Sequence, residues 1–336
     1  MITFHNPFHQ GHAPVHEFFR GERVPCFEKP ARVDYVEEAL RARGHGLMAP
    51  DVDSAPVLSQ VHAPRYLAFL QTAWQHWLAL DPANAGVQPF PSVWPVRTLR
   101  SDLEPENFVA RLGLYSMDNG TPMASGTWAA AKAGADAAAS AATLVAQGAR
   151  AAFCCTRPPG HHAGPDFMGG YCFLNNAAVA AQVLRNQGAQ RVALLDVDYH
   201  HGNGTQSIFY DRADVLFISI HGDPRTEYPF YLGHADETGV GEGAGFNLNL
   251  PLPAGTSATT WFDALESACA RIASQGADAL VVSLGLDTFE GDPISKFALA
   301  SADFTRVGER LARAGLPTVF VLEGGYAAAE LGTNAV

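Results

Sequence analysis

Carboxylates and imidazoles follow several apolar runs of the sequence, at the positions where strands are expected to end. The stretch ALLDVDYHHGNGT carries Asp196, Asp198 and His200 at alternate positions, which a locally extended backbone would direct to one side. The stretch VVSLGLDTFEGDP places Asp287 after another run. Two carboxylates and one imidazole from Asp198, His200 and Asp287 could hold a divalent cation and leave a coordination position open for water, as catalytic metal sites do.

Two adjacent histidines, His161 and His162, follow the turn RPPG. Beside a metal, such a pair can take a proton from a water that attacks an amide and deliver a proton to the leaving amine. Each ring needs a partner for its second nitrogen, and Asp196 and Asn203 are of the right types. We expect the ring that faces Asp196 to stay charged, and the ring that faces Asn203 to be neutral and to act as the base.

Tyr326 follows the run TVFVLEGG, on a Gly-Gly turn that we expect to be flexible. Its hydroxyl could donate to the oxyanion of a tetrahedral intermediate. Each polar residue also has an ordinary structural interpretation, because strand-end carboxylates often cap helices and a tyrosine after a strand often belongs to the core. That interpretation suffices for any single residue, but it becomes poor when all of them must be explained together.

The elements that must position these residues alternate along the chain. Short runs rich in Val, Ile and Leu alternate with Ala-rich segments of helical period, which is typical of an α/β fold with a parallel sheet covered by helices on both faces. Such sheets bind ligands beyond the carboxyl ends of their strands. The expected helices include residues 30–44 and 127–148. The expected strands are residues 2–5, 150–156, 191–197, 215–221, 279–285 and 318–324.

Composition limits the class of protein. The 336 residues, 47% of them hydrophobic and 17% charged, can bury a large core, and the absence of repeats and linkers favours a single domain over residues 1–336. The formal net charge of −12 argues against nucleic-acid binding, which relies on clustered cations. An acidic surface could attract a small cationic substrate, or it could serve solubility alone.

The cysteines and the N-terminal residues bear on the compartment. Five cysteines without CxxC spacing are interpreted as reduced core thiols. The N-terminal residues show no basic segment followed by an apolar one, and no apolar stretch reaches the roughly 18 residues that a membrane span needs. We therefore expect a soluble cytoplasmic protein without a membrane partner.

Residues 80–100, LDPANAGVQPFPSVWPVRTLR, are rich in proline, fit no periodic element and predict a long loop. Loops of this length in compact domains are usually functional or form interfaces. Phe90, Val93 and Trp94 could be covered by a second subunit, or they could pack back on their own domain.

The motifs RPPGHH, GGYCFLNNAA, DVDYHHGNGT, SLGLDTFEGDP and LEGGY resemble those of the histone deacetylase superfamily, and more closely those of its bacterial acetylpolyamine amidohydrolases. The resemblance extends from VPCFEKPAR to EGGY, nearly the whole chain. It implies an arginase/deacetylase-type fold, one α/β domain with about eight parallel strands. It also implies a metal-dependent hydrolase of linear amides that removes acetyl groups from small cationic amines such as acetylputrescine and acetylcadaverine.

The same resemblance implies metal ions: one catalytic Zn²⁺ per chain, with Fe²⁺ as an alternative in the cell, bound by Asp198, His200 and Asp287. It further implies structural K⁺. One K⁺ would be surrounded by Asp196, Asp198, His200, Ser219 and Ile220. A second would take backbone oxygens from Phe209, Arg212 and Val215.

Catalytic roles follow from the resemblance too. His162 would be the general base and later the acid, His161 its electrostatic partner paired with Asp196, and Tyr326 the oxyanion donor. Asn203 stands where one branch of the family has aspartate, which places the sequence with the class II-like and polyamine-deacetylase branch.

A substrate tunnel is implied by Gly170, Tyr171, Tyr228 and Ile294. A narrow aromatic slot suits an unbranched methylene chain that ends in an acetamide. Ile294 stands where eukaryotic polyamine deacetylases carry a glutamate gatekeeper, so cation selection must come from elsewhere.

Four acidic residues lie in segments that the bacterial enzymes use to build the tunnel mouth: Glu17, Glu104, Glu106 and Asp118. We predict that Glu17 and Asp118 hold the distal ammonium of the substrate, and that the loop 80–100 closes a homodimer over each entrance. Each acid could instead be a solvated surface carboxylate.

Three rival interpretations share parts of this pattern. A protein lysine deacetylase would need an entrance that admits a polypeptide. An arginase-like ureohydrolase would need two metals bridged by an Asp-x-His-x-Asp motif, where this sequence has His200, His201 and Gly202. An inert acetyl-ligand binding protein would have lost a ligand, a histidine or Tyr326, and none of them is missing.

Overall fold

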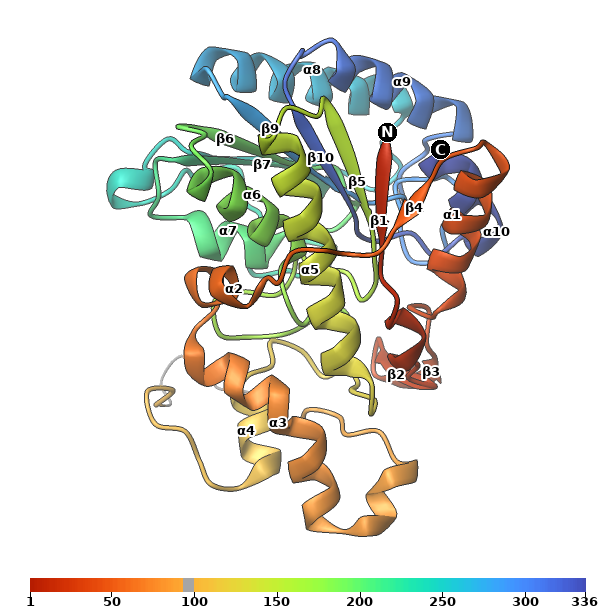
Figure 1. Ribbon diagram of the computed structural model, residues 1–336, viewed down its shortest axis with the longest axis vertical. Helices are drawn as coiled ribbons and strands as arrows, with labels where there is room; N and C mark the ends of the chain where they lie inside the picture. The colour runs from red at the N-terminus through yellow and green to blue at the C-terminus, as the bar shows by residue number, and fades with distance from the viewer. Residues whose placement is uncertain (93–99) are drawn as a thin grey trace.

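The computed structural model describes residues 1–92 and 100–336, and its centre is one large β-sheet (Figure 1). The strands are β1 (Ile2–His5), β2 (His16–Phe19), β3 (Glu22–Pro25), β4 (Leu47–Met48), β5 (Ala151–Cys155), β6 (Val192–Asp196), β7 (Val215–Gly222), β8 (Asn247–Leu252), β9 (Ala279–Leu284) and β10 (Thr318–Leu322). Eight of them form the sheet in the order β4-β1-β5-β10-β9-β6-β7-β8, and all their pairings are parallel. The predicted parallel sheet of about eight strands is thus confirmed.

Helices cover both faces of the sheet, as Figure 1 shows for α5 and α6 on one side and α8 and α9 on the other. The α-helices are α1 (Ala31–Ala42), α2 (Ala55–Val61), α3 (Pro64–Leu80), α4 (Phe108–Leu114), α5 (Thr127–Ala146), α6 (Asn176–Asn186), α7 (Asn203–Phe209), α8 (Ala258–Gln275), α9 (Ser301–Ala312) and α10 (Ala328–Ala335). Short 3₁₀ helices lie at His9–Gly11, Pro82–Gly86 and Gly241–Gly243. The two predicted helices correspond to α1 and α5.

The strands are apolar on both sides because each side packs on helices. In β5, Ala152 and Cys154 belong to the core cluster beneath α5 and α6, whereas Phe153 and Cys155 pack with α1 and α10. This alternation follows from the two-residue repeat of a strand. Continuous apolar runs therefore identified the central strands.

Four strands were not predicted from the sequence. The strand β8 reads NLNLPL and lies at an edge of the sheet, where its polar and proline residues are tolerated. The strand β4 has two residues, and β2 and β3 form a separate antiparallel hairpin. These short or half-exposed strands lack the apolar run that marks the centre of the sheet.

The loop predicted at 80–100 is partly helical at its start. Leu80 ends α3, and the 3₁₀ turn Pro82–Gly86 follows. Phe90 packs edge-to-face on Phe18 of β2, with ring centres 5.0 Å apart, so this side chain contacts its own chain. Val93 and Trp94 lie outside the described residues.

All five cysteines are free, and four of them are buried while Cys26 is half-buried. The expectation of core thiols is therefore wrong for Cys26 alone. Among the described residues, no helix has both the length and the apolar character needed to traverse a bilayer.

Candidate active site

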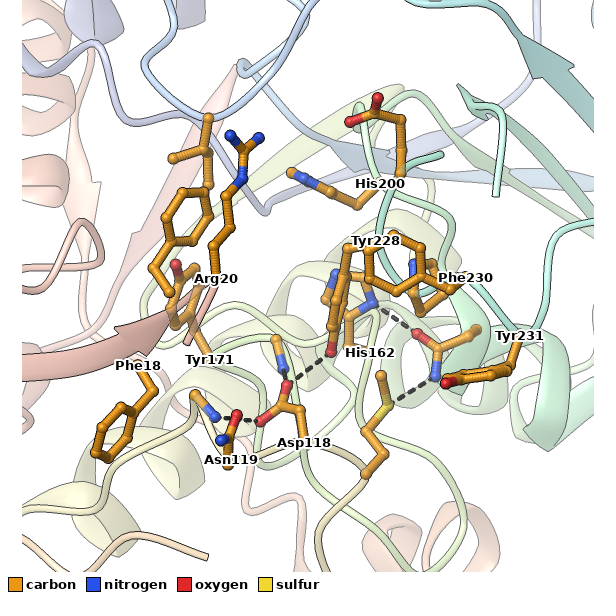
Figure 2. Close-up of a pocket in the computed structure, with 18 of the residues that line it drawn as sticks. Phe18, Arg20, Asp118, Asn119, His162, Tyr171, His200, Tyr228, Phe230 and Tyr231 are labelled. Carbon is orange, nitrogen blue, oxygen red and sulfur yellow. Dashed lines mark hydrogen bonds between the residues drawn. The ribbon is translucent and has the colours of Figure 1, made fainter. Parts of the chain in front are cut away.

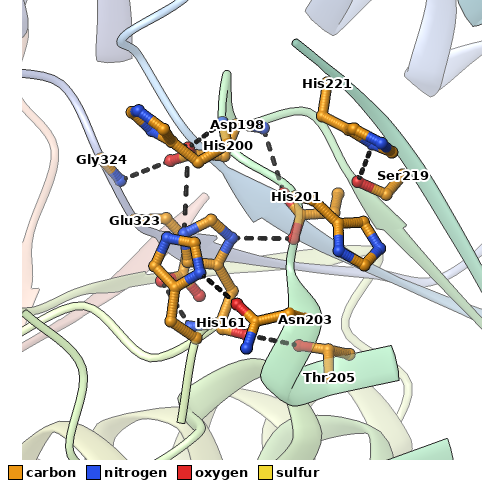
Figure 3. A network of polar contacts seen from close by, with 12 residues as sticks. His161, Asp198, His200, His201, Asn203, Thr205, Ser219, His221, Glu323 and Gly324 are labelled. Atoms are coloured by element: carbon orange, nitrogen blue, oxygen red, sulfur yellow. Dashed lines mark hydrogen bonds and ion pairs between the residues drawn. The ribbon is translucent and has the colours of Figure 1, made fainter. Parts of the chain in front are cut away.

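The candidate catalytic residues follow the carboxyl ends of four neighbouring strands and lie at the same end of the sheet. In the order β5, β10, β9 and β6, their carboxyl ends lead into His161 and His162, Tyr326, Asp287, and the pair Asp198 and His200. Figure 3 shows His161, from the segment after β5, beside Asp198, His200 and Asn203, from the segment after β6. The sheet therefore gathers residues that are far apart in sequence, as parallel sheets do.

Asp198, His200 and Asp287 form a compact cluster. Their ligand atoms all lie within 4.8 Å of one another, and His200 Nδ1 is 3.0 Å from Asp287 Oδ2 and 3.4 Å from Asp198 Oδ1. The backbone after Asp196 is bent rather than extended, since the His200 N–H donates to Asp198 Oδ1 at 2.9 Å. The side chains meet through this turn, so the expected extended geometry is wrong.

Burial disfavours the ionised forms of the carboxyl groups in this cluster. It raises the pKa of Asp287 to about 8, and the neighbouring charge of Asp198 acts in the same direction. Two carboxylates held together away from water repel each other in their ionised forms. A divalent cation would relieve that repulsion, and the aspartate and histidine donors are those that a catalytic site offers.

The adjacent histidines contact the partners that the sequence pattern predicts. His161 Nδ1 lies 2.9 Å from Asp196 Oδ2, and His162 Nδ1 lies 2.7 Å from Asn203 Oδ1. The two ring centres are 4.0 Å apart. The strand-end acid Asp196 thus orients an imidazole instead of capping a helix.

The two imidazoles differ in charge. Burial lowers the pKa of His161, but the charges of Asp198 and Asp196 outweigh it and hold the pKa well above the usual value. The pKa of His162 is well below the usual value because of burial and then the nearby charges of His161 and His200. These opposite shifts favour the charged form of His161 and the neutral form of His162.

Hydrogen bonds hold the turn that carries Tyr326. The Arg32 guanidinium donates to the Gly325 carbonyl at 2.6 Å and to the Glu323 carbonyl, and the Tyr326 N–H donates to Asp292 Oδ2 at 2.7 Å. These contacts hold the backbone that leads into the tyrosine, in contrast to the flexible turn that the sequence predicted.

A pocket of about 570 Å³ opens above this cluster (Figure 2). Its lining includes Tyr171, Tyr228 and Ile294 on the walls, with His162 and His200 as polar groups. The lining is mainly apolar and aromatic with a few polar groups, which is typical of small-molecule sites.

Gly170 has a specific steric role in this pocket. Its φ of +52° favours glycine, and a Cβ at this position would lie 2.1 Å from His162 Cδ2. The residue therefore lets the backbone of the wall pack directly against the imidazole.

Glu17 lies behind the pocket wall. It is 1% exposed, is not among the pocket-lining residues, and accepts hydrogen bonds from the Tyr171 hydroxyl at 2.7 Å and from the Phe27 N–H at 3.1 Å. The prediction that Glu17 holds the substrate ammonium is wrong in this geometry, and so is the surface alternative. Its carboxylate orients Tyr171 instead.

Asp118 does line the pocket, where it receives four donors. Oδ2 accepts from the Gly170 N–H at 2.6 Å and the Tyr228 hydroxyl at 2.8 Å, and Oδ1 accepts from Gly120 and Thr121. Among the described residues, no lysine or arginine forms an ion pair with Asp118, but Arg20 also lines this pocket.

Two contributors were missed by sequence reasoning. Arg32 lies in the segment KPAR and Asp292 in EGDP, and both segments belong to recognised motifs without any local sign of their role. The contacts that reveal them join residues 34 or more positions apart, Asp292 to Tyr326 and Arg32 to the same turn.

The residues proposed for K⁺ binding follow or belong to β6, α7 and β7. Asp196 of β6 and Ser219 of β7 are register neighbours, and Ser219 Oγ is 2.8 Å from His221 Nδ1. The Phe209 carbonyl accepts from the Arg212 N–H at 3.0 Å.

Comparison with known proteins places this geometry in a family. The sequence model of the histone deacetylase domain family matches residues 26–336 of this chain. The chain is 52% identical over its whole length to acetylpolyamine amidohydrolase 2 of Pseudomonas aeruginosa, covering 97% of it, and 46% identical over 95% of its length to the acetylpolyamine amidohydrolase of Mycoplana ramosa, covering 92%. A crystal structure of the acetylpolyamine aminohydrolase of Burkholderia pseudomallei matches with a TM-score of 0.93 at 39% identity, over 100% of this chain and 96% of that one. The chain belongs to the histone deacetylase family.

Proposed function

We propose that this protein is a metal-dependent deacetylase of small acetylated polyamines, such as acetylputrescine and acetylcadaverine, and that it releases acetate and the free amine. The observation that carries the proposal is the pair of unequal histidines, His161 and His162, beside the cluster of Asp198, His200 and Asp287 in a pocket lined by aromatic side chains. The names of the full-length relatives support the substrate class.

Asp198, His200 and Asp287 would hold one catalytic cation. Their nitrogen and oxygen donors suit Zn²⁺ and also Fe²⁺. When bound, the cation would supply positive charge that polarises the acetyl carbonyl and favours loss of a proton from water. We also propose that K⁺ ions bound at the two sites expected from the sequence stabilise the segments near the carboxyl ends of β6 and β7.

The chain's own side chains would move the protons. His162 is neutral and turns Nδ1 toward Asn203, so its Nε2 can accept a proton from the attacking water and pass it to the leaving amine. His161, charged beside Asp196, would stabilise the negative charge that develops on the carbonyl oxygen. The Tyr326 hydroxyl would donate a hydrogen bond to the same oxygen.

The pocket would select a linear cationic amine. Tyr171 and Tyr228 would flank the methylene chain, and the charge of Asp118 would attract the distal ammonium. An Asp118→Asn variant should lose most of its preference for acetylcadaverine over uncharged N-pentylacetamide. An unchanged preference would show that the ammonium is held elsewhere.

We further propose a homodimer that acts in the cytoplasm. Val15, Phe18 and Val87 are exposed apolar side chains, and Gln88 joins their two segments by hydrogen bonds to His16 and Val15. A second copy of the chain would cover them. The five free thiols suit a reducing compartment. Sedimentation equilibrium of the wild type tests the dimer, and a monomer would refute it.

Acetate release by the Zn²⁺-loaded protein tests the function. We expect acetylputrescine and acetylcadaverine to be hydrolysed far faster than an acetyl-lysine peptide, with little turnover by Tyr326→Phe. A preference for the peptide would instead identify a protein lysine deacetylase with an open entrance.

A further inference from the structure

The amide of Asn203 bridges a histidine and a methionine. Its Oδ1 lies 2.7 Å from His162 Nδ1, and its Nδ2 donates to the thioether sulfur of Met117 at 3.0 Å. Both contacts are among the dashed lines of Figure 2. The two ends of one small side chain are therefore engaged on opposite sides.

The two ends of an amide are chemically different. The oxygen only accepts hydrogen bonds and the NH₂ group only donates them, whereas a thioether sulfur is an acceptor without a proton to give. If the Asn203 amide turned over, its oxygen would face the lone pairs of Met117 and its NH₂ group would point at His162. Met117 thus favours the orientation that presents oxygen to the imidazole.

The orientation of the amide decides the tautomer of His162. A neutral imidazole carries one proton, and an oxygen beside Nδ1 stabilises the ring with the proton on Nδ1. Nε2 then keeps its lone pair, which a general base requires. A reversed amide would stabilise the other tautomer, with the proton on Nε2 and no basic lone pair there.

Met117 is itself held in place. Its N–H donates to the Met168 carbonyl at 2.9 Å, and its side chain packs over Gly169, where a Cβ would lie 2.2 Å from Met117 Cγ. The glycine leaves room for the thioether, and the backbone bond fixes its approach to Asn203. Met117 and Asn203 both line the pocket, so their contact lies in its wall.

We propose that Met117 is a positioning residue that locks the Asn203 amide with its oxygen toward His162 and so keeps His162 in its basic tautomer. The consequence for turnover rests on the proposed deacetylase function, while the consequence for the tautomer does not.

A double-mutant cycle tests the proposal in the Zn²⁺-loaded enzyme. Met117→Leu keeps the apolar bulk and removes the acceptor, so it should lower kcat for acetylcadaverine by about tenfold with KM changed less than about twofold. In an Asn203→Asp background both ends of the side chain are oxygens, and Met117→Leu should have no further effect. Met123→Leu, a change of a buried core methionine, is the matched control and should leave kcat unchanged.

Histidine ¹⁵N NMR gives a readout that does not depend on turnover. We expect the His162 nitrogens of the wild type to show the Nδ1-protonated form, and those of Met117→Leu to show a mixture of both tautomers. The proposal is overturned if Met117→Leu leaves the tautomer unchanged, or if it lowers kcat equally in the wild-type and Asn203→Asp backgrounds. If the wild type hydrolyses no acetylated amine, the proposed function fails, and the NMR comparison still decides the role of Met117.

Discussion

The guanidinium carbon of Arg32 lies 4.8 Å from the centre of the Tyr326 ring. Arg32 is fully buried and also pairs with Glu28 at 3.0 Å, so its charge cannot turn away from the ring. Burial raises the pKa of Tyr326 well above its usual value, although the charge of Arg32 opposes the shift. The hydroxyl therefore keeps its proton and remains a donor, on a ring held by a cation–π contact.

Loss of this hydroxyl should affect turnover far more than binding. We expect Tyr326→Phe to lower kcat by about 10²- to 10³-fold, the usual cost of removing one oxyanion donor, with KM nearly unchanged. Steady-state acetate release from acetylcadaverine measures both constants. Tyr35→Phe, on an exposed face of α1, is the control. A decrease of less than about tenfold would remove Tyr326 from the chemical step.

A side chain at Gly170 should disable the site without unfolding the protein. Gly170→Ala places a Cβ against His162, whereas Gly188→Ala introduces a similar positive-φ strain, at +109°, with nothing within 4 Å. Both changes should cost about 1 kcal/mol or more of unfolding free energy. Only Gly170→Ala should reduce kcat strongly. Equal activity of the two variants would show that the wall can move away from the imidazole.

The three-residue cluster predicts metal-dependent stability. Zn²⁺ in excess should raise the Tm of the chelator-treated wild type, because a ligand that binds only the folded state stabilises it. Asp287→Asn should remove most of this shift together with the activity. Asp263→Asn, at an exposed position of α8, should retain both. A zinc-induced shift of normal size in Asp287→Asn would place the cation elsewhere. Differential scanning fluorimetry at several Zn²⁺ concentrations makes the comparison.

Glu17 predicts a pH dependence of stability. Burial raises its pKa from 4.5 to about 7, although the hydrogen bond from Tyr171 opposes the shift. Because the folded protein holds this proton more tightly than the unfolded chain, stability should fall as the pH rises from about 4.5 to about 7, and then level off. The decrease amounts to about 3 kcal/mol at most.

Glu17→Gln removes the ionisation while keeping an oxygen that can accept from Tyr171. Urea unfolding at pH 5 and pH 8 should therefore show a smaller loss of stability in Glu17→Gln than in the wild type. Equal losses in the two proteins would mean that Glu17 ionises in the folded state as it does in water.

The sequence predicted the residues at the centre of the candidate site more accurately than those at its periphery. Asp198 and Asp287 follow apolar runs closely, His161 follows one after a short turn, and a parallel sheet brings such strand ends together without further information. The prediction for Glu17 was wrong because its burial depends on how the short β2–β3 hairpin packs. The spacing of apolar residues in the sequence does not predict this packing. The contact between Met117 and Asn203 joins residues 86 positions apart and leaves no local pattern.

The place of β10 in the sheet has a consequence for synthesis on the ribosome. β10 is the last strand along the described chain, yet it lies between β5 and β9. Until it emerges, β4-β1-β5 and β9-β6-β7-β8 are two separate sheets, each with an open edge that could pair with another nascent chain. The histidine pair then belongs to one sheet, and Asp198, His200 and Asp287 belong to the other. Translation must therefore reach residue 322 before the two halves of the candidate site can join.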